Sequence, residues 1–138
     1  MIRRVATPLL ASTLLLGLAA CGAQTSAADG SSPEVCSAMN SAKDSITSFA
    51  DSSGEKTVGD VQTKLTSISG QLDTAKGKST GLAQAIIGNL QSSVGAATQA
   101  LQGVSPDSPI SDLPSGFAGS RTKVKTTFDE VYTKLQCS

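Results

Sequence analysis

Four segments of the chain repeat apolar residues at alternating spacings of three and four, which is typical of one buried face of an α-helix. Each segment is bounded by short polar stretches, so the sequence predicts four amphipathic helices of roughly 20 residues. The apolar positions are Val35, Met39, Ala42, Ile46 and Phe49; Val58, Val61, Leu65, Ile68, Leu72 and Ala75; Ala83, Ile87, Leu90, Val94, Ala97, Leu101 and Val104; and Phe117, Val124, Phe128, Val131 and Leu135.

Polar and helix-breaking residues mark the ends of these segments. Ser32 followed by Pro33 is a typical helix start, and Thr57 with Asp60 three residues later forms a variant of the capping box. The other expected boundaries are Gly77 at the end of the second helix, Ser79 or Thr80 as the cap of the third, a loop containing Pro106, Pro109 and Pro114, and Ser115 at the start of the fourth.

Four helices joined by short polar links favour an all-α, antiparallel, up-down-up-down four-helix bundle. We assign this bundle domain to residues 33–138. The chain has no Trp, three Phe and one Tyr, so the core is expected to be thin and mainly aliphatic.

The first twenty residues form a separate, non-globular segment. Arg3 and Arg4 precede sixteen uncharged residues, Val5–Ala20. This run is shorter than the roughly 20 residues that a membrane-spanning helix needs, and it follows the pattern of an export signal. Residues 1–20 are therefore predicted to be a cleaved signal peptide.

The motif Leu18-Ala19-Ala20-Cys21 closes that segment. It resembles the lipobox of bacterial lipoproteins, whose cysteine is diacylated and becomes the mature N-terminus. The resemblance implies an exported protein, anchored through Cys21 to the extracytoplasmic face of the cell membrane; two acyl chains suffice for stable anchoring. The alternative is an ordinary signal peptide followed by an incidental cysteine. Residues 21–32 are small and polar, as expected of a flexible tether.

Richness in Ser, Thr, Ala and Gly makes the chain similar to small lipoproteins of high-GC Gram-positive bacteria, a resemblance that implies no particular activity. With Cys21 assigned to lipid, Cys36 and Cys137 remain as an even pair in an oxidising compartment. In the predicted topology they lie at the same end of the bundle, so we expect a disulfide. The alternatives are two free thiols or half of a metal site.

Composition argues against several classes of function. Without residues 1–20 the chain has nine Lys and Arg against eleven Asp and Glu, a balance unsuited to a nucleic-acid-binding protein. It has no histidine, and its carboxylates lack paired-acid or metal-ligand spacing, so we expect no enzyme, metal or cofactor. We expect a monomer that contacts the membrane through lipid on Cys21.

Two surfaces are candidates for binding a partner. Ile110 and Leu113 lie in the proline-rich loop, where they either form a docking surface or cover the end of the core. Gly81, Gly88 and Gly95 share one face of the third predicted helix. This face either packs closely against a neighbouring helix or forms a shallow groove for a partner or apolar ligand.

Two groups of basic residues each allow two interpretations. Arg121 interrupts the apolar positions of the fourth helix near its start, where its guanidinium would reach water or pair with Asp51, Glu55 or Asp60. A role in binding an anionic ligand is the alternative. Lys76-Gly77-Lys78 lies at the end expected to face the membrane, either as a contact with anionic lipid or as a solvated turn.

The sequence therefore predicts a membrane-anchored lipoprotein of the cell envelope that acts as a non-catalytic binding or structural module, with an envelope protein as a possible partner. The alternative function is a carrier that holds a small apolar, lipid-like molecule between its helices.

Overall fold

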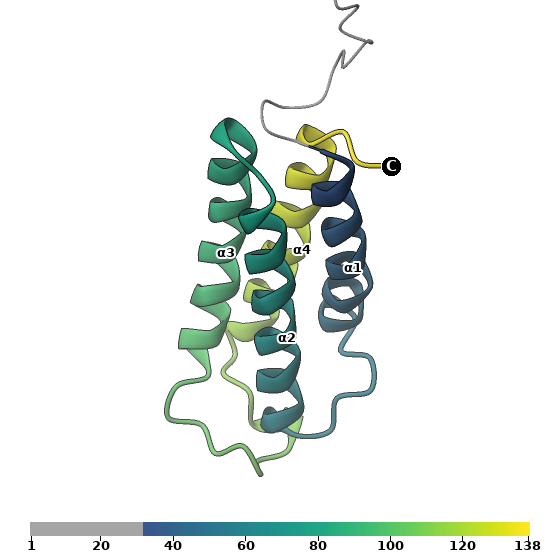
Figure 1. The fold of residues 1–138 in the computed structure, drawn as a ribbon. Coiled ribbons are helices and arrows are strands. Elements are labelled where there is room, and N and C mark those ends of the chain that lie inside the picture. Colours follow the sequence, from purple (N-terminus) through teal and green to yellow (C-terminus); the bar gives the residue numbers. More distant parts are fainter. Residues whose placement is uncertain (1–31) are drawn as a thin grey trace, which may run out of the picture.

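The computed structural model describes residues 32–138, which form an all-helical bundle (Figure 1). The predicted signal peptide, Cys21 and the tether up to residue 31 lie outside the described residues. The elements are α1 (Pro33–Ala50), α2 (Val58–Gly77), α3 (Gly81–Ala100), the short 3₁₀ helix η1 (Ile110–Asp112) and α4 (Phe117–Lys134).

The helices are arranged as an antiparallel ring. α1 packs against α2 and α4, and α3 packs against α2 and α4, so helices adjacent in the chain are neighbours in space (Figure 1). The predicted up-down-up-down four-helix bundle is confirmed. We call the end that holds the start of α1, the α2–α3 turn and the end of α4 the disulfide end. We call the opposite end, with the α1–α2 link and the α3–α4 loop, the loop end.

The core consists of the apolar positions that the sequence pattern identified. Almost all of them are buried, most with no exposed area, and Ile86 joins them. Val104 is only partly buried and packs against the edge of this core. Aliphatic side chains dominate, with Phe49 and Phe117 meeting edge to face near the loop end, their ring centroids 6.0 Å apart. Burial of these side chains is the main force that assembles the bundle.

The disulfide joins Cys36 in the first turn of α1 to Cys137 just after α4, with their Cα atoms 5.2 Å apart. The predicted pairing is confirmed. Because the antiparallel order brings both cysteines to one end, the bond closes the ring between its first and last helices.

Helix boundaries follow the capping residues at most positions. The Ser32 hydroxyl accepts a hydrogen bond from the Val35 N–H at 3.3 Å. Thr57 and Asp60 form a complete capping box at the start of α2. Thr80 is the cap of α3 but makes no side-chain capping bond. Ser79, the alternative, is buried and donates to the Lys76 carbonyl at 2.8 Å.

Two helix ends differ from the prediction. α3 ends at Ala100, before the predicted positions Leu101 and Val104. Leu101 lies in the turn that follows the helix, where its side chain is still buried in the core and its N–H donates to the Thr98 carbonyl at 3.1 Å. Such three-residue bonds commonly tighten the last turn of a helix. α4 begins at Phe117 with Gly116 as its cap, so the expected start at Ser115 is wrong. A turn closed by the Phe117 N–H and the Pro114 carbonyl, at 2.8 Å, occupies the intervening residues.

The capping carboxylate of Asp60 makes the stability of α2 dependent on pH. Its Oδ2 accepts hydrogen bonds from the N–H groups of Lys56 at 2.8 Å and Thr57 at 3.0 Å, and these bonds lower the pKa of Asp60. A lowered pKa stabilises the fold above the ordinary carboxyl pKa of about 3.9, and this stability disappears as the pH falls through the lower folded value. We expect Asp60→Asn to melt at a lower temperature than the wild type at pH 7, and at nearly the same temperature once the Asp60 carboxyl of the wild type is protonated.

Thermal melts followed by circular dichroism between pH 7 and pH 2 measure this difference. Asp107→Asn, at an exposed loop position, is the matched control and should track the wild type throughout. A difference between Asp60→Asn and the wild type that stays constant across this pH range would contradict the capping explanation.

Candidate functional site

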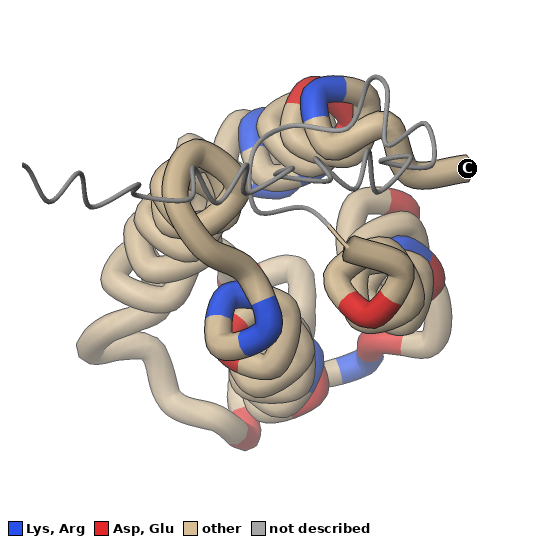
Figure 2. Tube along the Cα trace, turned by 45° about the horizontal axis from the view of Figure 1, so that its top comes forward, with Lys and Arg blue, Asp and Glu red and all other residues tan. Residues whose placement is uncertain are grey.

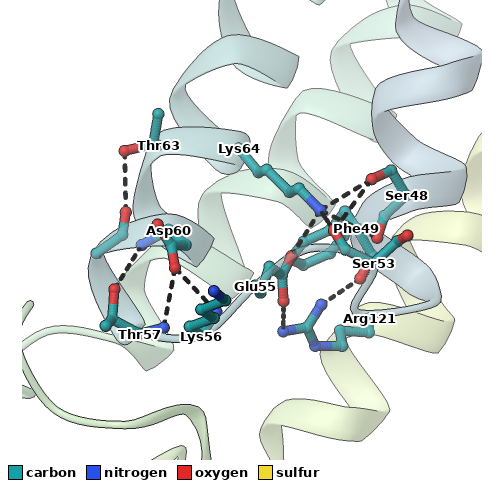
Figure 3. A network of polar contacts seen from close by, with 11 residues as sticks. Ser48, Phe49, Ser53, Glu55, Lys56, Thr57, Asp60, Thr63, Lys64 and Arg121 are labelled. Carbon is teal, nitrogen blue, oxygen red and sulfur yellow. Dashed lines mark hydrogen bonds and ion pairs between the residues drawn. The ribbon is translucent and has the colours of Figure 1, made fainter.

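The loop end contains a polar cluster built around Arg121, the residue that interrupts the apolar positions of α4 (Figure 3). Only 7% of its side chain is exposed. Its guanidinium donates to the Phe49 carbonyl and to Glu55 Oε2. The guanidinium carbon also lies 4.7 Å from the ring centroid of Phe49 and 5.1 Å from that of Phe117. The arginine is thus stacked on aromatic rings and paired with a carboxylate inside the bundle.

Lys64 of α2 completes this cluster from the other side of Glu55. Its Nζ lies 3.4 Å from Glu55 Oε1, whose side chain has no exposed area. The same ammonium donates to the Ser48 hydroxyl at 2.8 Å, to the Ser48 carbonyl at 3.3 Å and to the Ser53 carbonyl. These contacts connect the end of α1, the α1–α2 link, α2 and α4 (Figure 3).

The cluster also satisfies backbone groups that a helix leaves unpaired. The last carbonyls of an α-helix have no partner within the helix. Here Lys64 binds the carbonyl of Ser48, and Arg121 binds that of Phe49, both near the end of α1. The role of Arg121 is therefore structural. Of the expectations for this residue, pairing with Glu55 is right and a guanidinium in water is wrong.

The α3–α4 loop is fixed against the start of α2 by main-chain hydrogen bonds. The N–H groups of Val58 and Gly59 donate to the carbonyls of Ser108 at 2.9 Å and Pro106 at 2.8 Å. These N–H groups belong to the first turn of α2, which has no intrahelical acceptors for them. A Cβ added at Gly59 would lie 3.1 Å from the Pro106 oxygen, so glycine permits this close approach. The loop thus caps α2.

Ile110 and Leu113 come together in this loop, at the two ends of η1. Both are half-buried, and Leu113 packs against the core. They line a surface hollow of about 310 Å³, together with Ser52, Pro114, Ser115, Phe117, Ala118 and Arg121. The two candidate residues therefore form apolar parts of the lining of a shallow hollow to which Arg121 also contributes.

The three glycines of α3 do not form one site with this hollow. Gly81 is the first residue of α3, at the disulfide end, and its φ of 55° lies in the left-handed region that the α2–α3 turn uses. Gly88 and Gly95 are half-buried, and a Cβ added at either would meet nothing within 4 Å. Close packing of a neighbouring helix therefore does not explain these two glycines.

Two other hollows on the described surface are lined mainly by polar types of residue. One of about 350 Å³ is lined by Asp44, Ser45, Ser48, Lys64 and Ser67. Another of about 560 Å³ is lined by Gly59, Gln62, Thr63, Thr66, Ser67 and Pro106. Sites for small apolar ligands are usually concave and lined mainly by hydrophobic side chains. Neither of these two hollows has that character.

Two residues of interest were missed by the sequence pattern. Lys64 carries no signal, because a lysine beside an apolar position is normally solvent-exposed. Leu82 could have been found from the sequence, because it is a leucine that lies beside the apolar positions of α3 and is not one of them. In the structure it is 56% exposed.

Comparison with known proteins found no matching family model, no matching curated protein and no matching solved structure. Within residues 32–138, no helix combines the length and apolar character required to cross a membrane. The same residues contain no group of three or more Cys, Asp or Glu side chains positioned to hold a metal ion.

Proposed function

We propose that the protein is a lipoprotein held on the extracytoplasmic face of the cell membrane by lipid on Cys21, and that it acts there as a non-catalytic binding module. The lipobox-like motif Leu18-Ala19-Ala20-Cys21 carries the proposal. It follows a basic start and an uncharged run too short to span a bilayer, which together are typical of an export signal.

The topology of the bundle supports this arrangement. α1 begins at Pro33 at the disulfide end, only twelve residues after Cys21. A lipid anchor at Cys21 would therefore hold the disulfide end toward the membrane and leave the loop end pointing away from it. The hollow beside Ile110 and Leu113 would then face outward, where an envelope protein could reach it.

The hollow at the loop end is the part of the surface that best suits a protein partner. Its lining is partly apolar, and Asp112 and Asp51, which are both exposed, adjoin lining residues in the chain. An apolar side chain with a basic neighbour would complement this surface in shape and charge. We therefore place the partner-binding surface at Ile110 and Leu113.

Removing the proposed lipid attachment site should release the protein. We expect wild-type protein to fractionate with membranes and Cys21→Ala to lose this association, because lipid on the cysteine is the proposed anchor. The matched control is Ser26→Ala, which changes a nearby residue and keeps the motif. Immunoblots of membrane and medium fractions measure the distribution. Equal membrane association of Cys21→Ala and wild type would contradict anchoring at this residue.

A second experiment separates a binding module from a lipid carrier. A photo-crosslinking amino acid at the exposed position Ser111, between Ile110 and Leu113, should give a discrete protein adduct in intact cells. The adduct should disappear when Ile110 and Leu113 are both replaced by serine, and the same crosslinker at Lys123 on the exposed face of α4 should not give it. Recovery of a stoichiometric apolar molecule from the purified protein, with no such adduct, would instead support the carrier function.

A further inference from the structure

The disulfide end carries an exposed apolar residue. Of the large apolar side chains in residues 32–138, only that of Leu82 is exposed, at 56%. It lies in the first turn of α3, directly after the α2–α3 turn. The adjacent core position Ala83 is fully buried, so Leu82 does not complete the core.

Lysines gather at the same end. Lys76 lies in the last turn of α2, Lys78 in the α2–α3 turn and Lys134 in the last turn of α4. Acidic residues lie at this end too: Glu34 in the first turn of α1, and the exposed Asp73 and Glu130 about one turn before the ends of α2 and α4. The three lysines take part in none of the ion pairs found in residues 32–138; Lys78 and Lys134 are exposed and Lys76 is half-buried. Hydrogen bonds with its own backbone and with Ser32 lower the pKa of Glu34, and the charge of Lys78 adds a smaller contribution. Figure 2 shows the disulfide end brought forward, with the lysines of α2 and α4 in blue.

At the loop end, acidic residues outnumber basic ones. Its exposed acidic residues are Asp51, Asp60, Asp107 and Asp112, and its exposed basic residues are Lys56 and, in the second turn of α4, Lys123. The buried Glu55 offsets only one of the two positive charges of Arg121 and Lys64, so these three residues together add one net positive charge. Lysines thus lie at the tip of the disulfide end, in the α2–α3 turn and the last turn of α4, whereas exposed carboxylates outnumber exposed lysines at the loop end.

We propose that the disulfide end rests on the surface of an anionic phospholipid bilayer, with Leu82 inserted at the headgroup level and Lys76, Lys78 and Lys134 facing lipid phosphates. The inference depends on the proposed anchoring through Cys21. An anionic leaflet attracts each lysine held near its surface, so Lys76, Lys78 and Lys134 favour this orientation over one in which the loop end, where carboxylates outnumber lysines, meets the bilayer.

The anchor explains why so small a contact is sufficient. The eleven peptide steps from Cys21 to Ser32 span at most about 40 Å when fully extended, and about 18 Å on average if they behave as a coil. A bundle attached by such a segment meets the bilayer at a high effective concentration. One leucine and three lysines, too weak to recruit a free protein, can then orient one that is already tethered.

The absence of tryptophan from the chain allows a direct test. Leu82→Trp places a single indole at the proposed contact, and Gln99→Trp places one at an exposed position near the other end of α3. Full-length lipidated protein is reconstituted into vesicles of phosphatidylcholine with phosphatidylglycerol. Emission of the Leu82→Trp protein should shift to shorter wavelength and be quenched by lipids brominated on their acyl chains. Emission of the Gln99→Trp protein should do neither.

Paired Lys→Gln variants test the contribution of the lysine charges. In the Leu82→Trp background, Lys76→Gln with Lys78→Gln should reduce the ratio of docked to undocked protein by about five- to twentyfold, since each lysine near an anionic surface contributes about fivefold. Lys56→Gln with Lys123→Gln removes the same charge from exposed positions away from the disulfide end and should leave the ratio unchanged. Vesicles of phosphatidylcholine alone should give a weaker shift than the mixed vesicles.

Failure of the contact is distinguishable from failure of the anchor. Lipidated protein that floats with the vesicles, but whose Leu82→Trp emission stays unshifted and unquenched, would overturn the membrane contact and leave the anchor standing. An equal shift produced by a soluble anionic polymer in the absence of vesicles would also overturn it. Protein that fails to float with the vesicles would overturn both proposals.

Discussion

Replacing Arg121 with leucine is expected to lower the free energy of unfolding by about 3 to 5 kcal/mol, because the change leaves the carboxylate of Glu55 buried without its main partner. Lys64, 3.4 Å from the other carboxylate oxygen, would compensate only in part. The substitution also removes the hydrogen bond to the Phe49 carbonyl and the stacking on Phe49 and Phe117.

A double-mutant cycle tests whether this loss comes from the ion pair. Glu55→Leu combined with Arg121→Leu should be more stable than Arg121→Leu alone, because no uncompensated charge then remains inside. Lys123→Leu, two residues away on the exposed side of α4, is the matched control and should change stability by about 0.5 kcal/mol or less. Urea unfolding curves give the free energies. A loss below about 1 kcal/mol for Arg121→Leu would show that the buried cluster does not hold the loop end together.

Removal of the Cys36–Cys137 disulfide is expected to have a comparable effect. The bond closes a loop with a sequence separation of 101 residues. The chain-entropy model assigns roughly 4 to 5 kcal/mol to a loop of this length, and measured values are often lower. For a domain of this size, a loss of that order lowers the melting temperature by about 15 to 30 °C.

Cys36→Ala with Cys137→Ala measures this contribution without a reducing agent. Its melting temperature should match that of reduced wild type, while Cys21→Ala, which removes a cysteine outside the bond, should melt like the oxidised wild type. Far-ultraviolet circular dichroism at low temperature should remain helical, because the apolar core is unchanged. A melting temperature within about 5 °C of the wild type would show that the bond contributes about 1 kcal/mol or less.

The bundle was largely predictable because its determinants are local. The spacing of apolar residues follows from 3.6 residues per helical turn, and Ser32 and Thr57 cap their helices through side chains three residues from the bonded N–H groups. The same periodicity extended α3 too far. Leu101 faces the core from a turn, and spacing alone cannot tell a buried turn residue from a helical one.

The loop end could be predicted only in part, because its contacts join residues far apart in the chain. The sequence offered three acidic partners for Arg121, and only the fold selects Glu55. Lys64 contributes through carbonyls of Ser48 and Ser53, which no side-chain pattern reveals. Ile110 and Leu113 were expected in a loop, but their common hollow depends on main-chain bonds between that loop and α2.

The glycines of α3 show a different limit. Their separation by seven residues is visible in the sequence. Only the structure shows that Gly81 belongs to a turn and that Gly88 and Gly95 have open space beside them. Gly59, which no spacing pattern distinguished, is the glycine that permits a close approach, to Pro106.

Mass spectrometry of the N-terminal peptide from membrane fractions tests the central claim, anchoring through Cys21, most directly. We expect a mature chain that begins at Cys21 and carries the added mass of acyl chains on that residue, with Cys36 and Cys137 linked in the same molecule. An N-terminal peptide containing Cys21 without lipid, recovered from membranes or from the medium, would contradict it.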